Sequence, residues 1–396
     1  MYSCTLTRSS FVKLERKYPK HPRYTRACGN ILSKFDTFFT LAMLDSVEQE
    51  GEVYGFYVTS ELPEDITYEF IDFAKSVERI LSSDLNDDEL TDMYFEVKQM
   101  LKICEIFDKR FKLYIEAHND EVTLRLLCLD ASYMLDRMMR KGISTILFSA
   151  TLTPLEYFSD ILGCGGCAAL NLKSPYDREN LCLLGVNNVS TRYGDRQKSA
   201  LAVANIIRAT VAGKPGNYMV YFPSYTYLSD VKDIFEKKYP GIRVTTQLKS
   251  MSDNAKMDFL SSFNTEESKT LIGFCVMGGS FSEGIDLKGE RLIGAVIIGV
   301  GLPTISSELN IIKEYFDNTR ENGYAYAYTY PGMNKVLQAA GRVIRSEKDR
   351  GVVVLVDDRF ATEEYRALMP ESCHHIRYLN NANDLLRTVQ SFWKKS

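Results

Sequence analysis

The stretch LIGAVIIGV, residues 292–300, decides the fold. It is apolar throughout and too short for a membrane helix, which is typical of a strand buried on both faces of a sheet. Similar runs occur along the C-terminal two thirds of the chain: ISTILFS (143–149), NYMVYFP (217–223), IRVTTQ (242–247), TLIGFCV (270–276) and GVVVLVDD (351–358). Amphipathic stretches at 195–213 and 225–239 predict helices between them. The sequence therefore predicts an α/β fold, with a parallel sheet covered by helices on both sides.

The first 110 residues show a different pattern. Apolar residues recur at steps of three and four over residues 33–50, 64–83 and 87–110, which predicts three helices. Asp87 and Asp88 are suited to cap the last of them. Two short apolar runs follow, FKLYIEA (111–117) and EVTLRLLCLD (121–130), and predict a hairpin with HND as its turn.

The composition is that of an ordinary globular protein. Of the 396 residues, 45% are hydrophobic and 25% are charged, and the net charge of −4 does not by itself indicate nucleic-acid binding. No apolar run is long enough to span a membrane, and the N-terminus lacks the apolar core of a signal peptide. We therefore expect a cytoplasmic location and no membrane partner.

Cysteine usage gives little support for a metal site. The nine cysteines are scattered and odd in number, which favours a reducing compartment over a disulfide framework. Cys164 and Cys167 form a CxxC, but no second Cys or His pair stands at metal-ligand spacing. Two cysteines in a glycine-rich loop are the favoured interpretation, and the sequence identifies no metal ligands.

In parallel sheets, functional groups lie in the loops after the carboxyl ends of strands, so these loops are the first candidates for a functional site. After ISTILFS, Ser149 and Thr151 present two hydroxyls. After NYMVYFP, Ser224 and Tyr225 open a helix, where they could contact a phosphate or stack on a base. Each pair has an ordinary alternative, because hydroxyls cap helices and aromatic rings beside a strand are often core.

The loop after TLIGFCV, MGGSFSEGIDLKGE (277–290), is polar and rich in glycine. Gly278, Gly279 and Gly284 would let backbone amides approach a ligand closely. The loop also contributes two hydroxyls and two carboxylates, from Ser280, Ser282, Glu283 and Asp286. A loop with a purely structural role remains the alternative.

The stretch QAAGRVIRSEKDRG (338–351) places Gln338, Arg342 and Arg345 four and then three residues apart. On a helix, this spacing puts all three on one face, where two guanidinium groups and an amide suit a phosphate. Pro331 is suited to the first turn of that helix. A solvated basic face is the alternative.

Together these loops resemble a known family. SATLTP (149–154), YFPSY (221–225), GGSFSEGIDLKGE (278–290) and QAAGRVIRSEKDRG are similar, in this order, to motifs III, IV, V and VI of superfamily 2 helicases of the XPD/DinG type. SPYDREN (174–180) and TRYGDR (191–196) also resemble DinG-type sequences, and the likeness runs from about residue 130 to about residue 360.

This resemblance implies a RecA-like second lobe that helps to clamp ATP with Mg²⁺. Arg342 and Arg345 would be arginine fingers pointing together into the nucleotide cleft, with Gln338 beside them. Glu283, Gly284 and Asp286 would bind the nucleotide and link it to the DNA groove. The residues that would lie along single-stranded DNA are Ser224, Tyr225, Ser280 and Ser282. Ser149 and Thr151 would couple the nucleotide site to the DNA groove.

The motifs of the first lobe are not found in this sequence. It contains no GxxxxGK[ST] loop, no DEAH box and no match to the iron–sulfur cysteines of many relatives. Two segments imitate parts of the missing motifs. EAHN (116–119) resembles a DEAH box but is expected to form a hairpin turn. Asp357-Asp358 resembles a metal-binding strand end, but it follows motif VI, where the family has a plain strand. We therefore expect the C-terminal portion of a helicase, whose partners are single-stranded DNA and a first RecA-like lobe that carries the Walker A loop.

The expected division has three parts: a helical arch-type insertion at 1–112, a C-terminal piece of the first lobe with motif III at 113–162, and the second lobe at 163–396. Alone, the chain is not expected to hydrolyse ATP. Two alternatives stay open: a non-catalytic module that binds single-stranded nucleic acid, and an interaction protein that donates its arginines in trans to a separate ATP-binding lobe.

Overall fold

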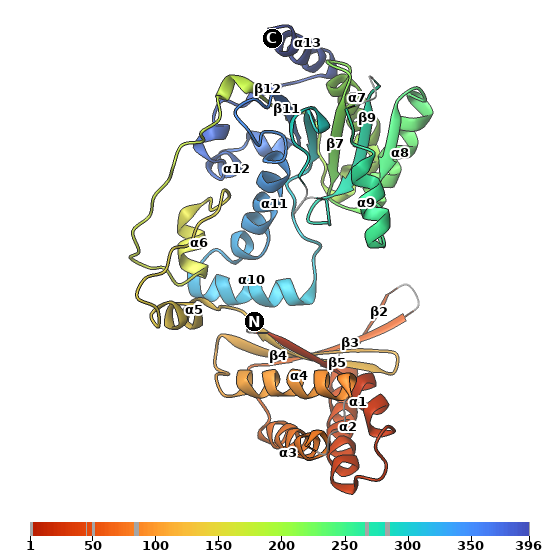
Figure 1. Cartoon of the computed structure of the whole chain (residues 1–396), viewed down its shortest axis with the longest axis vertical. Helices are drawn as coiled ribbons and strands as arrows, with labels where there is room; N and C mark the ends of the chain where they lie inside the picture. Colours follow the sequence, from red (N-terminus) through yellow and green to blue (C-terminus); the bar gives the residue numbers. More distant parts are fainter. Residues whose placement is uncertain are drawn as a thin grey trace. The chain divides into compact units, whose positions relative to one another are not determined.

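The structure is a computed structural model that describes residues 3–44, 46–49, 52–82, 87–265, 269–281 and 286–395. The chain forms two compact units (Figure 1). Unit 1 contains residues 1–144 and 161–163, and unit 2 contains residues 145–160 and 164–396. Each unit has a hydrophobic core of its own.

Unit 1 packs four helices against one face of an antiparallel sheet (Figure 1). The strands follow the order β1-β5-β4-β3-β2. Their bounds are β1 Cys4–Thr7, β2 Val47–Gln49, β3 Glu52–Thr59, β4 Phe111–His118 and β5 Glu121–Cys128. The helices of this layer are α1 Arg8–Glu15, α2 Pro22–Met43, α3 Glu64–Leu81 and α4 Asp88–Cys104, and α5 Ser132–Met139 follows the sheet.

The sequence predicted much of unit 1. Helices α3 and α4 are confirmed, and the Asp87 carboxylate caps α4 by accepting from the Leu90 amide at 3.2 Å. The predicted hairpin is β4 and β5, and Asn119 takes the left-handed conformation in its turn. The segment expected at 33–50 begins earlier, ends at Met43 and is followed by strand β2. The region is mainly helical as expected, but it also contributes β1, β2 and β3, which the sequence analysis missed.

Unit 2 is built on a seven-stranded parallel sheet with the order β12-β6-β11-β10-β7-β9-β8. The α/β prediction is therefore confirmed. The strands are β6 Leu181–Val186, β7 Asn217–Phe222, β8 Arg243–Thr246, β9 Leu271–Val276, β10 Gly294–Ile298, β11 Gly351–Val356 and β12 Arg377–Leu379.

Both faces of this sheet are covered, and successive strand residues supply the two cores alternately. In β7, Val220 and Phe222 face one core, whereas Met219 and Tyr221 face the other. The first core is completed by α7 Arg196–Val211, α8 Tyr225–Lys238 and α13 Ala382–Lys394. The second contains residues of α9 Asp253–Ser261, α11 Tyr330–Ala340 and α12 Glu363–Ala367. Three further helical segments lie wholly or mostly in unit 2: α6 Leu155–Ile161, α10 Ser307–Arg320 and the π-helix Ala325–Thr329.

One strand prediction was wrong. ISTILFS (143–149) forms no strand, and Ile146 and Phe148 are 82% and 89% exposed. A strand is stable only when neighbours pair with its backbone, and no strand in the described part of the chain pairs with this segment. Conversely, β6 and β12 were missed, although LCLLGV (181–186) is a six-residue apolar run of the kind that predicted the other strands.

The expected domain boundaries stay predictions. The boundary after residue 112 falls inside β4, so residues 113–128, assigned from the sequence to the first lobe, belong to the antiparallel sheet of unit 1. Within the described ranges, no helix is both long and apolar enough to cross a membrane. The cytoplasmic location remains a prediction from the sequence.

Candidate functional site

The arginine-bearing segment differs from its predicted geometry. Helix α11 ends at Ala340, so Arg342 and Arg345 do not share a helical face with Gln338. The buried Asp349 explains the end of the helix: its carboxylate accepts from the backbone amides of Arg345 and Ser346, both at 2.8 Å. These amides would otherwise need helical carbonyl partners. The arginines therefore lie in the connection from α11 into the amino end of β11.

Both arginines act electrostatically on a buried tyrosine of the sheet. Burial raises the pKa of Tyr221 on β7, and the positive charges of Arg342 and Arg345 both act against this rise. The Arg345 side chain is 19% exposed, so it is a cation partly withdrawn from water.

Arg345 makes an ion pair with the glycine-rich loop. Its Nη1 lies 2.6 Å from Oδ1 of Asp286, and Lys288 Nζ lies 3.0 Å from the other carboxylate oxygen. The Lys288 ammonium and then the Arg345 guanidinium hold the pKa of Asp286 below its usual value. Residues predicted from motifs V and VI thus meet in the structure, although the pairing of Arg345 with a nearby carboxylate was not expected.

Two glycines set the position of α11 against the sheet. Gly301 follows β10 with a φ of +70°, and a Cβ there would lie 2.4 Å from the carbonyl oxygen of Gly332. A Cβ on Gly332 would lie 2.7 Å from the carbonyl oxygen of Val300. The backbone of α11 therefore touches the backbone of the β10 loop, which only residues without side chains allow.

The described part of the glycine-rich loop lies against α11 and β8. Gly278 has a φ of +73°, and the Lys335 side chain of α11 covers it. Gly279 lies against Gln247, and Ser280 is exposed. The buried Phe281 anchors the end of this stretch: its ring stacks on Phe259 at 4.2 Å, and its carbonyl accepts from the Tyr221 hydroxyl. The predicted site residues Ser282, Glu283 and Gly284 lie outside the described residues.

Ser224 and Tyr225 open α8 as predicted. The Ser224 hydroxyl caps the helix by accepting from the Tyr227 amide at 3.3 Å. The Tyr225 hydroxyl accepts from the side-chain Nε2 of Gln247 at 3.1 Å, and the side-chain Oε1 of Gln247 accepts from the Val276 amide at 2.9 Å. Gln247 thus joins the start of α8 to the ends of β8 and β9. The sequence analysis missed this role, although a glutamine directly after a short strand is the signal that could have indicated it.

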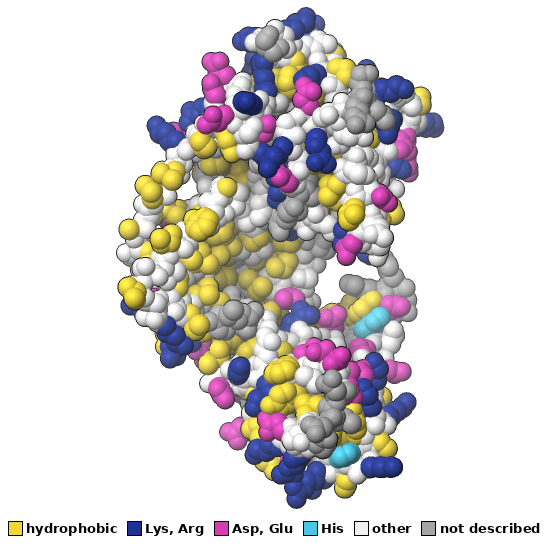
Figure 2. Space-filling view, viewed as in Figure 1, with side chains coloured by type: hydrophobic (Ala, Val, Ile, Leu, Met, Phe, Trp, Pro, Cys, Tyr) yellow, Lys and Arg dark blue, Asp and Glu magenta, His cyan; other side chains and the backbone are white. Residues whose placement is uncertain are grey.

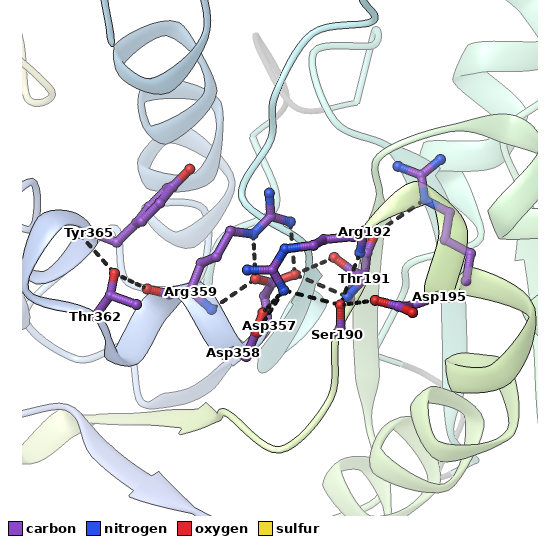
Figure 3. Close-up of polar contacts among 10 residues, drawn as sticks. Ser190, Thr191, Arg192, Asp195, Asp357, Asp358, Arg359, Thr362 and Tyr365 are labelled. Carbon is purple, nitrogen blue, oxygen red and sulfur yellow. Dashed lines mark hydrogen bonds and ion pairs between the residues drawn. The ribbon is translucent and has the colours of Figure 1, made fainter. Parts of the chain in front are cut away.

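A second polar network lies at the ends of β6 and β11 (Figure 3). The fully buried Asp357 accepts from the Thr191 amide and hydroxyl and forms a two-point ion pair with Arg359. Burial alone would raise the pKa of Asp357, but the Arg359 guanidinium outweighs it and the pKa lies below its ordinary value. Beside it, Arg192 binds both oxygens of Asp358 at 2.7 and 2.6 Å.

The carboxylates of Asp357 and Asp358 therefore serve to hold the loop 187–195, which contains most of TRYGDR. The sequence analysis gave this loop no role. An acid placed directly after a buried strand and two residues before an arginine is the signal for such a buried pair.

Ser149 and Thr151 lie in the exposed segment that precedes α6. The Thr151 amide donates to the Ser149 hydroxyl at 3.2 Å, and the two hydroxyls lie 3.3 Å apart. They are thus close to one another, but no contact joins them to the arginine or glycine-rich loops among the interactions of the described residues.

The visible face of unit 2 has a mixed charge, and the acidic side chains in the described parts form no metal centre (Figure 2). On the face of unit 2 seen in Figure 2, Lys and Arg side chains are interspersed with Asp and Glu. No group of three or more His, Cys, Asp or Glu side chains is placed to hold a metal ion within the described ranges. None of the nine cysteines forms a disulfide.

Comparison with known proteins identifies related sequences. Residues 207–376 match the family model of the helicase C-terminal domain. The chain is 24% identical to the ATP-dependent DNA helicase CHL1 of Debaryomyces hansenii, over 69% of this chain and 37% of that protein. It is 23% identical to the XPD helicase subunit of the general transcription and DNA repair factor IIH of Arabidopsis thaliana, over 74% and 40%. The chain thus spans well under half the length of these relatives.

Solved structures support the same fold. The structure titled XPD_APO superposes with a TM-score of 0.55 at 18% identity, covering 96% of this chain and 73% of that one. The structure of S. tokodaii Xpd4 gives a TM-score of 0.57 at 14% identity, covering 95% and 72%. Residues 207–376 thus resemble a helicase C-terminal domain, and the relatives and the fold agree that the chain is similar to part of the XPD-type superfamily 2 helicases.

Proposed function

We propose that this chain supplies the arginine-finger half of the ATP site of a DNA helicase, together with part of its single-stranded DNA groove. The observation that carries the proposal is the ion pair between Arg345 and Asp286, which joins the arginine segment to the glycine-rich loop. A motor needs such a connection, because a change at the nucleotide must reach the loops that contact DNA.

The arginines would act by charge. Phosphoryl transfer develops negative charge on the transferred group, and an arginine that stabilises it contributes about 10³–10⁵ in rate. The charges of Arg342 and Arg345 both act on Tyr221, and Gln338 lies on α11, four residues before Arg342. The Asp286 side chain is 55% exposed, so it can move away from Arg345. The γ-phosphate would then bind Arg345 in place of this carboxylate when the two lobes close. Gly284 and Glu283 are proposed to take part from the same loop.

The described residues fit the phosphate but not the metal. Two guanidinium groups suit a triphosphate, whereas no cluster of carboxylates in the described ranges suits Mg²⁺. Mg²⁺ would neutralise charge on the β- and γ-phosphates when bound. We therefore propose that a first RecA-like lobe with a Walker A loop and a DEAH box holds it, and that this chain alone does not hydrolyse ATP.

The DNA groove is proposed to follow the loops after β7 and β9. Ser224 and Tyr225 open α8, and Ser280 is an exposed hydroxyl of the glycine-rich loop, with Ser282 beyond it. These hydroxyls and amides would contact the phosphates of a single strand. Ser149 and Thr151 are proposed to couple nucleotide and DNA, as the motif III resemblance implies.

The nucleotide half of the proposal is tested by joining the chain to a first lobe, either in one polypeptide or as a separate protein. We expect DNA-stimulated, Mg²⁺-dependent ATP hydrolysis from the pair and none from this chain alone. Arg345→Ala should lower kcat by about 10³-fold or more. Arg387→Ala is the matched control, because this arginine of α13 has a side chain that is 82% exposed.

Two results would contradict the proposal. One is metal-dependent ATP hydrolysis by the purified chain alone that Arg345→Ala abolishes. The other is an active pair in which Arg345→Ala and Arg387→Ala have the same small effect, because the guanidinium of Arg345 would then have no part in the chemistry.

A further inference from the structure

Tyr193 is an exposed aromatic residue to which no function has been assigned above. It lies in the 3-10 turn Tyr193–Asp195, between β6 and α7, and is 88% exposed. Its neighbours in the loop are polar or small: Arg192, Gly194 and Asp195. A protein interface needs a contiguous apolar patch, which a lone ring among such residues does not provide.

The turn that carries Tyr193 is held by several side chains (Figure 3). The Ser190 hydroxyl donates to Asp195 at 2.7 Å, and the Asp195 amide donates to the Arg192 carbonyl at 2.8 Å. Arg192 binds Asp358 on the neighbouring strand end. Such anchoring lowers the conformational entropy that an exposed aromatic would lose on binding, so the ring is suited to receive a ligand.

The buried Asp357 fixes the start of the turn. It binds the backbone and side chain of Thr191, two residues before Tyr193. Gly299, at the end of β10, allows this close packing, because a Cβ there would lie 2.8 Å from the Thr191 hydroxyl. Three neighbouring strands, β6, β11 and β10, therefore determine where the ring is placed.

Arg196 links Tyr193 to the start of α8. Its guanidinium carbon lies 5.6 Å from the centre of the Tyr193 ring, and its Nη1 donates to the Ser224 hydroxyl at 3.3 Å. Its Nε donates to the Thr191 carbonyl at 3.2 Å. The ring thus lies beside a fixed positive charge and near Ser224, which is proposed above to contact the strand. A nucleobase can stack on an aromatic ring in any sequence context, and an arginine adds a cation–π contribution.

We infer that Tyr193 is a stacking platform for one base of a single-stranded nucleic acid that lies along the carboxyl edge of the unit 2 sheet. The inference rests on the proposed function, since it assumes that the strand passes Ser224. It adds a contact to a base, whereas the groove residues proposed above contact phosphates.

The test compares the full chain with Tyr193→Ala and Tyr193→Phe in a fluorescence anisotropy titration. One probe is an oligothymidylate, and the other is an abasic oligonucleotide of equal length that keeps every phosphate. We expect Tyr193→Ala to raise Kd for the oligothymidylate about 5- to 100-fold and to leave Kd for the abasic strand unchanged. Tyr193→Phe keeps the ring and should bind both probes as the wild type does.

Tyr324→Ala is the matched control, because Tyr324 is also an exposed tyrosine of unit 2, at 47%. Equal Kd values for the wild type and Tyr193→Ala on the oligothymidylate would overturn the inference while leaving the proposed DNA groove in place. Loss of binding to both probes by Tyr193→Ala would also overturn it, because the effect would then not depend on a base. If the wild-type chain binds neither probe, the DNA half of the proposed function fails, and this inference fails with it.

Discussion

At the scale of single residues, Asp357 and Asp358 are adjacent in sequence but have opposite environments. Asp357 is fully buried against Arg359, whereas the side chains of Asp358 and Arg192 are 39% and 49% exposed. Removing one partner of a buried ion pair leaves an uncompensated charge, which costs about 3–5 kcal/mol. An exposed pair contributes at most about 1 kcal/mol.

We therefore expect Asp357→Asn to lower the free energy of unfolding of unit 2 by about 3 kcal/mol or more, and Asp358→Asn by less than about 1 kcal/mol. Urea unfolding monitored by circular dichroism would measure both. Similar losses for the two variants would show that Asp357 is not the buried anchor of the loop 187–195.

The same carboxylate predicts a pH dependence. The pKa of Asp357 is lower in the folded state than its ordinary value, because the favourable interaction with Arg359 outweighs burial. Its contribution to stability is therefore complete above the ordinary pKa, near pH 4, and is lost as the pH falls through the lowered pKa. Between pH 5 and pH 2, the wild type should lose more unfolding free energy than Asp357→Asn does, in the same urea titrations. Equal slopes would contradict this assignment.

At the scale of elements, the placement of α11 depends on contact between two backbones. Gly332 would gain helix propensity on mutation to alanine, so propensity alone predicts a stabilised protein. The contact with the Val300 carbonyl predicts the reverse, because a Cβ would approach that oxygen to 2.7 Å.

We expect Gly332→Ala to lower the free energy of unfolding by about 1–3 kcal/mol, the usual cost of overpacking. It should also reduce ATP hydrolysis by the chain joined to a first lobe, because α11 leads into Arg342 and Arg345. Gly241→Ala is the control for thermal or urea unfolding, since nothing lies within 4 Å of its added Cβ. A stabilised Gly332→Ala would mean that α11 can shift away from the sheet without penalty.

The elements also show where prediction from sequence succeeds. Strands such as β7 and β10 are apolar on both faces, so their sequences alone identify them as buried. Pro331 lies in the first turn of α11 as expected, although the π-helix Ala325–Thr329 runs directly into that helix. The end of α11 was not predicted, although Asp349, which accepts from the amides of Arg345 and Ser346, is only four and three residues away.

At the scale of the whole molecule, the chain consists of two units with separate hydrophobic cores. All residues from 141 to 150 and from 165 to 174 are exposed and lie outside helices and strands. Proteases cut such segments before they cut packed elements.

We expect limited trypsin treatment to cut first after Lys141 and Lys173. This leaves two large resistant fragments, close to residues 1–141 and 174–396, and a short piece, 142–173, that contains α6 and stays bound to unit 2 through contacts such as Asp160 with Arg320. Mass spectrometry of a time course would identify them. Lys173→Gln should abolish the second cut without exposing new sites. Early cleavage within α7 or α3 would contradict the division into two packed units.

The sequence by itself determined the elements that a local pattern identifies: the apolar strands of unit 2, its amphipathic helices, the α3 and α4 helices of unit 1, and the order of the motif-bearing loops. Hydrophobic periodicity is local, so it can be read without knowing the partners of a segment. Tertiary structure alone decided which distant groups meet. Strand order and loop packing bring together Arg345 with Asp286, Asp357 with Thr191, and Arg196 with Tyr193 and Ser224. ISTILFS is exposed and forms no strand, which shows that even an apolar run needs neighbouring strands to become one.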